Sequence, residues 1–275
     1  MAKRAALSWD GFASRRPVLQ EMYDGSSSPQ ATAETLASMA TSELSEGQLS
    51  MEAGAGVTWG FLVTSVRELP EHHGLLVDLM VCFSTMDHFG SDGEVERFYG
   101  MRVWRDYPML GWDLHGEWNS LDVAPHPNPE RTAQAAQFLN VNKFCALLML
   151  TDVPAFNYQM FALWTMRQAL ETPTDQATFR HCPEVYVPAA ASWILLLGSQ
   201  IYKWDKEFEH GPTIGAPGRG DALWPGKHGF CEERWMLWRS RFDEFAGMEP
   251  GVGEEVRLSA SNAATRMREI EAGGR

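Results

Sequence analysis

Two polar residues lie on otherwise apolar helical stripes in the second half of the chain, where they could act on a bound molecule. Asn142 shares its stripe with Phe138, and Arg167 shares its stripe with Trp164. Residues three or four positions apart lie on the same face of a helix, so both side chains are expected to point into the bundle or into a cavity. An amide and a guanidinium in such places could bind and orient a ligand.

A buried arginine needs a partner, because an isolated charge inside a protein is costly. Near Arg167 the sequence offers Glu171 one turn further along the same helix, and Asp113 or Glu117 from an earlier segment. Two interpretations stay open. The polar residues form an internal hydrogen-bond network that fixes the register of the helices, or they polarise a ligand.

The chain is rich in bulky apolar side chains, with 11 Trp and 14 Met. Trp164 and Trp193 fall at core-type positions, and an aromatic stripe at helical spacing usually belongs to a core. Aromatic faces together with Met also line sites for apolar small molecules. The sequence therefore predicts a Trp-rich pocket between helices, with ligand contacts from Asn142, Arg167, Trp164 and Trp193.

Asp113, His115 and Glu117 alternate along the chain and form the best metal-like pattern. They would share one side of an extended segment, but in a helix their side chains spread apart. The favoured interpretation is a set of polar residues on a short amphipathic helix, so we expect no metal and no cofactor. Arg234 and Arg241 are expected to neutralise acidic neighbours rather than to bind phosphate.

The elements that position these residues are predicted to be helical almost throughout, because apolar residues recur at helical spacing and strand-like alternation is scarce. We expect one all-α domain over residues 1–275, an irregular bundle of nine or ten helices. Predicted helices cover 28–44, 58–69, 71–86, 130–151, 154–170, a segment from Pro183, 232–246 and 259–272. Between them are a partly flexible N-terminal extension at 1–27, a long connection at 87–131 with short helices, and a Gly/Pro-rich loop at 211–229.

Composition restricts the partners and the compartment. The net charge of −13 disfavours nucleic acid and anionic membrane surfaces. The four cysteines lie far apart and form no CxxC pair, which is typical of reduced cysteines and predicts a cytoplasmic protein. The longest apolar stretch, residues 185–198, is too short to span a bilayer.

Five segments carry a family resemblance: Pro108–Asn119, Asn140–Ala146, Ala162–Glu171, Val187–Ile194 and Leu223–Phe242. They resemble a fungal family catalogued as domain of unknown function 3632. The last segment, with its Trp-Pro-Gly and Arg-Trp pieces, is the most specific. The resemblance implies a helical fungal protein without assigned chemistry or catalytic residues. Cys231 departs from it, because a serine that caps the following helix is expected there and a thiol caps poorly.

Two functions from different classes follow. The first is a small-molecule enzyme or binding protein that acts on an apolar ligand in the Trp-rich pocket. With the fungal resemblance, this suggests a cofactor-independent cyclase or isomerase of secondary metabolism, working through shape and electrostatic preorganisation. The alternative is a non-enzymatic helical module for protein–protein interaction, whose surface would be the 87–131 region or the 211–229 loop. The sequence does not decide whether the protein is an enzyme, and it does not give the oligomeric state.

Overall fold

The computed structural model describes residues 12–47, 49–120, 129–173, 182–249 and 251–274. Within these residues it contains ten α-helices and one two-stranded hairpin, which confirms the predicted all-α irregular bundle. The chain divides into two compact units. The first comprises residues 1–120 and 151–155, and the second comprises residues 121–150 and 156–275. The expected single domain over 1–275 is not tested by this division and stays a prediction.

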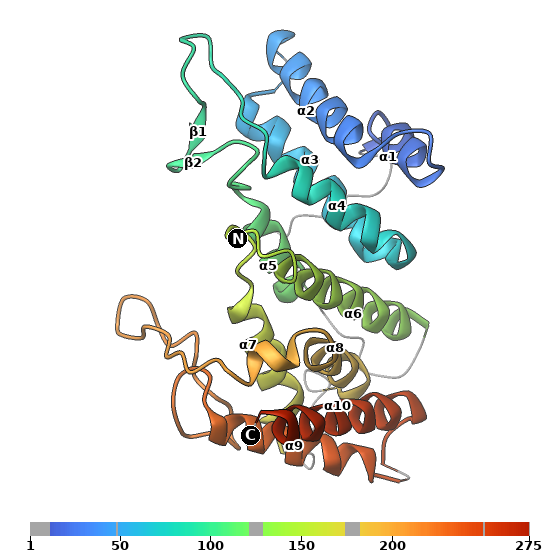
Figure 1. Ribbon diagram of the computed structural model, residues 1–275, viewed down its shortest axis with the longest axis vertical. Coiled ribbons are helices and arrows are strands. Elements are labelled where there is room, and N and C mark those ends of the chain that lie inside the picture. The colour runs from blue at the N-terminus through green and yellow to red at the C-terminus, as the bar shows by residue number, and fades with distance from the viewer. Residues whose placement is uncertain (1–11, 48, 121–128, 174–181, 250, 275) are drawn as a thin grey trace. The chain divides into compact units, whose positions relative to one another are not determined.

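The described part of the first unit holds five helices and the hairpin (Figure 1). They are α1 (Arg16–Tyr23), α2 (Pro29–Ser45), α3 (Met51–Glu68), α4 (His73–Phe83), α5 (Leu110–Ser120), β1 (Arg97–Phe98) and β2 (Met101–Arg102). Helix α1 lies in the expected N-terminal extension, of which residues 1–11 fall outside the described residues. The strands were not predicted, because two residues are too short to produce a periodic signal.

Helix α3 begins at Met51 rather than at the predicted Thr58. Its N-cap is Ser50, whose hydroxyl accepts a hydrogen bond of 3.2 Å from the amide of Ala53. Gly54 therefore lies inside the helix. A Cβ added there would be 3.0 Å from the Cβ of Ala40, so the glycine lets α2 and α3 approach closely.

An aromatic cluster forms the core of the first unit. The ring of Trp59 on α3 lies 5.2 Å from Phe83 and 5.5 Å from both Trp104 and Tyr107, measured between ring centroids. The Tyr107 hydroxyl donates a hydrogen bond to the carbonyl oxygen of Met80. These contacts anchor the start of the long 87–131 connection to α3 and α4; residues 121–128 of that connection lie outside the described residues.

The second unit is built around α8 (Pro183–Ile201), which packs against α6 (Pro129–Met149), α7 (Gln159–Leu170) and α10 (Glu254–Gly273). Figure 1 shows α8 between α6 and α10. Ala189, Ala190 and Ala191 are buried, as expected for a central helix. A Cβ added at Gly198 would come within 2.7 Å of the Ile270 side chain, so this glycine lets α10 pack closely on α8.

The remaining helix, α9 (Glu232–Ala246), has the bounds predicted from the sequence. Its N-cap is Cys231, whose side chain makes no capping hydrogen bond. The first turn instead carries Glu232 and Glu233, whose negative charge favours the N-terminal end of a helix. Helix α10 begins earlier than predicted, at Glu254 rather than Ser259, and it also has two acidic residues in its first turn.

Candidate functional site

A buried ion pair joins the end of α7 to the start of α9. Glu171 follows the last residue of α7, and Arg234 lies in the first turn of α9. The guanidinium donates from Nε to Oε1 at 2.7 Å and from Nη2 to Oε2 at 2.9 Å, a bidentate arrangement. Neither side chain has any exposed surface. Arg234 therefore neutralises an acidic neighbour, in agreement with the sequence analysis.

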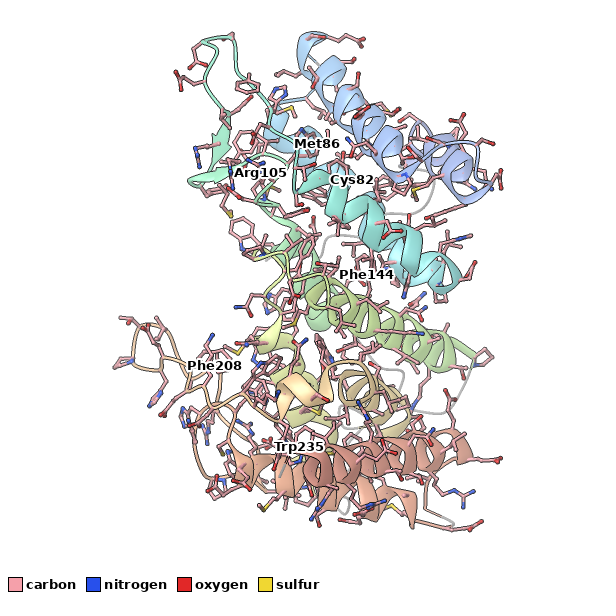
Figure 2. All side chains as sticks on the ribbon, viewed as in Figure 1. Cys82, Met86, Arg105, Phe144, Phe208 and Trp235 are labelled. Carbon is pink, nitrogen blue, oxygen red and sulfur yellow. The ribbon has the colours of Figure 1, made fainter. Side chains whose placement is uncertain are left out.

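The same arginine also binds the loop between α8 and α9, which covers residues 202–231 and is called the α8–α9 loop below. Its Nη1 donates to the carbonyl oxygens of Gly218 at 3.1 Å and Gly229 at 2.7 Å. The loop has two arms, residues 206–208 and 228–230, which pair through their backbones. The amide of Phe208 donates to the carbonyl oxygen of His228, and the amide of Phe230 donates to the carbonyl oxygen of Lys206. Figure 2 labels Phe208 on one arm.

Glu171 accepts further hydrogen bonds from α9 and from the α8–α9 loop. Its Oε1 accepts the indole N–H of Trp238 at 2.8 Å, and its Oε2 accepts the backbone amide of Asp221 at 3.1 Å. Its own carbonyl oxygen accepts the amide of Leu223 at 2.9 Å. A buried carboxylate needs such donors to offset the loss of water. The α8–α9 loop is thus fixed to the end of α7 through this one residue.

Arg241 lies about two turns after Arg234 on α9 and stabilises the C-terminal end of α7. It donates from Nε to the carbonyl oxygen of Leu170 and from Nη2 to that of Thr172, both at 3.0 Å. Cations are favourable at this end of a helix, where carbonyl groups lack intrahelical partners. The Thr172 hydroxyl in turn donates to Asp221 at 2.8 Å, which adds another link to the loop.

Glycines let the loop close tightly on itself. A Cβ at Gly229 would overlap the carbonyl oxygen of Lys206, and a Cβ at Gly220 would overlap Trp224. Trp224 also packs under Gly226, and its indole N–H donates to the carbonyl oxygen of Lys227 at 2.9 Å. Side chains larger than hydrogen do not fit at these points, which explains why glycine occupies positions 220, 226 and 229.

Together α7 and the α8–α9 loop form a cleft of about 720 Å³. Its lining includes Arg167 from α7 and, from the loop, Arg219, Asp221, Trp224, Pro225 and His228. This volume lies in the range of about 300–1,000 Å³ that small-molecule sites usually have. The lining combines an aromatic ring with several ionisable groups, and the network around Glu171 fixes its loop side.

Arg167 contacts backbone oxygens rather than a carboxylate. Its Nη1 lies 3.0 Å from the carbonyl oxygen of Arg219 and 3.5 Å from that of Pro217, while Glu171 is bound to Arg234. Partial burial lowers the pKa of the Arg167 guanidinium, and the charge of nearby Glu171 partly opposes this effect. Trp164 lies beside it and donates its indole N–H to Pro217 at 2.9 Å.

The other two predicted site residues lie in a closed network. The side-chain oxygen of Asn142 accepts hydrogen bonds from the Thr165 hydroxyl at 2.6 Å and the Trp193 indole at 2.8 Å. Its amide donates to the Phe138 carbonyl oxygen at 2.9 Å. Asn142, Thr165 and Trp193 have no exposed surface. The four predicted site residues thus lie in two places. Arg167 and Trp164 both contact the α8–α9 loop. Asn142 and Trp193 bind each other between α6, α7 and α8.

Sequence reasoning missed the loop residues Arg219, Trp224 and His228. Trp224 belongs to the Trp-Pro-Gly piece of the most specific family segment, which was the available signal. No local pattern indicates that these residues face Arg167, because the contacts that fold the loop reach back about fifty positions along the chain.

The metal-like pattern of Asp113, His115 and Glu117 lies on helix α5, as the favoured interpretation expected. Glu117 forms an ion pair with Arg67 of α3 at 3.4 Å. Partial burial raises the pKa of the Glu117 carboxyl, and Arg67 opposes this shift. In the parts of the chain that the structure covers, no cluster of three or more His, Cys, Asp or Glu residues is placed to hold a metal ion.

Fold and site define an all-α protein with a polar cleft bounded by one helix and a glycine-rich loop. The chain belongs to the DUF3632 family, described as proteins of unknown function, whose model matches residues 59–242. The match includes Glu171, Arg234 and the whole α8–α9 loop. No curated protein and no solved structure matches the chain. Across the described ranges, no helix is both long and apolar enough to cross a membrane.

Proposed function

We propose that this protein binds a small organic molecule in the cleft between α7 and the α8–α9 loop. The observation that carries the proposal is the cleft of about 720 Å³, which Trp224 and Arg167 both line. Ligand sites combine apolar surface with a few polar groups that orient the ligand, and this cleft is a polar example of such a site. This modifies the expected interhelical pocket, because Asn142 and Trp193 satisfy each other while Arg167 belongs to the cleft.

As an enzyme, the protein would suit a cofactor-independent isomerisation or cyclisation. His228 is the type of residue that moves a proton between carbon and oxygen atoms, and Arg167 is the type that stabilises negative charge developing on oxygen. Both line the cleft, which supports this reaction class. A binding protein without turnover would use the same contacts.

The test is to follow the 11 indole N–H signals by ¹⁵N NMR while a fragment mixture is added. The Trp224 signal is assigned with the Trp224→Phe variant. We expect fragments to shift Trp224 and to leave Trp59, in the core of the first unit, unchanged. If no fragment at millimolar concentration shifts Trp224, the proposal is wrong.

A second candidate, the protein–protein interaction module, is favoured by exposed aromatic side chains in the 87–131 region. Phe89, Tyr99 and Trp112 are 60%, 68% and 66% exposed, and the last two rings lie 5.6 Å apart. Exposed apolar patches often mark interaction sites. The same NMR experiment discriminates the two candidates, since fragments that shift Trp112 alone would favour this surface.

We also propose a fungal source, a cytoplasmic location and a role in secondary metabolism. The segments that resemble a fungal family support the first, and four free cysteines support a reducing compartment. The net charge of −13 further supports a small-molecule ligand over nucleic acid. A fluorescent fusion of the full chain, expressed in a filamentous fungus, tests the location; fluorescence in the secretory pathway would contradict it.

A further inference from the structure

The cleft concentrates positive charge in an acidic protein. Arg167 and Arg219 line it together with His228, against a single acidic residue, Asp221. The chain as a whole carries a net charge of −13. A local excess of cations in such a chain attracts anions to that place and not to the rest of the surface.

The acids near the cleft are already bound to other groups. Asp221 accepts hydrogen bonds from the Thr172 hydroxyl at 2.8 Å and from the amide of Ala222 at 2.8 Å. Glu171 is neutralised by Arg234. Neither carboxylate forms an ion pair with Arg167 or Arg219, so no direct partner among the described residues cancels the charges of the two cleft arginines.

The two arginines of the cleft, in contrast, have N–H groups that are available for a ligand. Arg167 uses Nη1 for two backbone oxygens, whereas its Nε and Nη2 have no hydrogen-bond partner among the described residues. One end of the guanidinium is therefore fixed and the other end is open, which lowers the entropy lost when it binds an anion. The exposed side chain of Arg219 makes no ion pair within the same residues.

His228 lines the cleft and has a polar ring atom without a partner among the described residues. Its Nδ1 is buried and has no hydrogen-bond partner in the described chain, although the ring contacts that of His210 at 4.3 Å. A buried polar atom without a partner is unfavourable and is often satisfied by a ligand or an ordered water. Trp224 and Pro225 supply an apolar surface next to these polar groups.

We propose that the cleft recognises a small organic oxyanion, a molecule whose carboxylate or phosphate binds Arg167 and Arg219 while its apolar part packs on Trp224. Guanidinium groups match both oxyanions in geometry and bind them with two parallel hydrogen bonds. This inference rests on the proposed binding function and specifies the chemical class of the ligand.

The experiment compares matched probes by calorimetry and by the Trp224 indole signal. Benzoate and phenyl phosphate carry the oxyanion, benzamide is a neutral analogue of similar shape, and inorganic phosphate lacks the ring. We expect benzoate or phenyl phosphate to bind at least about tenfold more tightly than benzamide, because one good charge-assisted contact is worth roughly that factor. The stronger of the two shows whether the group is a carboxylate or a phosphate.

Variants identify the residues that bind the anion. Arg219→Met, at an exposed position, is expected to weaken anion binding about tenfold without loss of folding, and Arg167→Met is expected to weaken it at least as much. The matched control is Arg266→Met on α10, which removes the same charge outside the cleft and should leave binding unchanged. Circular dichroism checks that each variant is folded.

Each outcome has a defined meaning. Equal binding of benzoate and benzamide at Trp224 overturns the oxyanion inference but leaves the binding function in place. Equal loss in Arg219→Met and Arg266→Met also overturns it, because a general charge effect would then explain the binding. Tight binding of inorganic phosphate alone supports the oxyanion site and overturns the role of Trp224. If no probe shifts Trp224, the oxyanion inference fails, and the fragment mixture then decides separately whether the binding function stands.

Discussion

At the scale of single residues, the pair of Glu171 and Arg234 holds the candidate site together. The carboxylate accepts four side-chain or backbone donors, and the guanidinium also binds three loop carbonyl oxygens. From the sequence, Glu171 was one of three candidate partners of Arg167, and Arg234 was expected to neutralise an acidic neighbour. The actual partner lies 63 positions away, and only the packing of α7 against α9 brings the two together.

Removing one member of this pair should be severe. Arg234→Met leaves a fully buried carboxylate without its cation and frees the carbonyl oxygens of Gly218 and Gly229. We expect a loss of about 3–5 kcal/mol in the free energy of unfolding, measured by urea denaturation. The control is Arg266→Met, which breaks an exposed pair with Glu269 and should cost less than about 1 kcal/mol. Equal losses in both variants would contradict this prediction.

A second prediction at this scale concerns pH. Asp106 accepts three hydrogen bonds from Arg102, one from its amide and two from its guanidinium, and these hold the pKa of the Asp106 carboxyl below its usual range. A lowered pKa in the folded state means that the ionised form stabilises the fold. This stabilisation is present above the ordinary pKa of about 4 and is lost as the pH falls through the lowered value.

We therefore expect Asp106→Asn to be less stable than the wild type by about 1 kcal/mol at pH 7, a modest value because the pair is partly exposed. The difference should shrink as the pH falls from 5 to 3. Chemical denaturation at several pH values measures it, and a difference that stays constant down to pH 3 would count against the role of the carboxylate.

At the scale of elements, specific hydrogen bonds fix the α8–α9 loop to the helices around it. Its arms pair through isolated bridges. Arg234 of α9 binds the carbonyl oxygen of Gly229, and Glu171 at the end of α7 binds the amide of Asp221. The indole of Trp238 on α9 also donates to Glu171. Glycine is required where the arms touch, because another residue's backbone occupies the position of a Cβ. The Gly/Pro content predicted a loop correctly but contained no information on these contacts.

The glycines of this loop should therefore differ in their tolerance to alanine. Gly229→Ala places a methyl group on the carbonyl oxygen of Lys206 and should cost about 1–3 kcal/mol in the free energy of unfolding. Gly211→Ala is the matched control, since nothing lies within 4 Å of the added atom. Thermal or urea unfolding of both variants tests this difference. Similar stabilities would show that the arms are not packed as described.

At the scale of the whole molecule, the chain combines two compact units with a strongly acidic composition. Each unit has its own buried aromatic residues, Trp59 and Trp104 in the first and Trp193 and Trp238 in the second. A compact unit with its own core can unfold locally while the rest of the chain remains folded. The network of Glu171 and Arg234 lies entirely within the second unit.

Hydrogen exchange tests whether the units behave separately. In Arg234→Met we expect amide protection in α7 and α9 to fall by about a hundredfold, the factor that corresponds to about 3 kcal/mol, because the buried interaction between these two helices is lost. Protection in α3 and α4 should stay unchanged. An equal fall in both units would show one cooperative domain, as the sequence analysis expected for residues 1–275.

The sequence by itself determined the helical class, most helix positions and the glycine-rich loop. These features depend on neighbours within a few positions, such as the apolar spacing of α9 or the N-cap Ser28 of α2, so local patterns contain them. It also identified Arg167 as a polar residue on an apolar face and expected it in a pocket between helices, whereas the residue lines a cleft formed with the α8–α9 loop.

Only the tertiary structure decided which polar residues satisfy each other and which remain open. Asn142 and Trp193 close a network inside the second unit, whereas Arg167 keeps free donors beside Trp224. These outcomes depend on contacts between segments about fifty positions apart. No local pattern contains such contacts, because they arise when buried polar groups on separate elements must find partners as water is excluded.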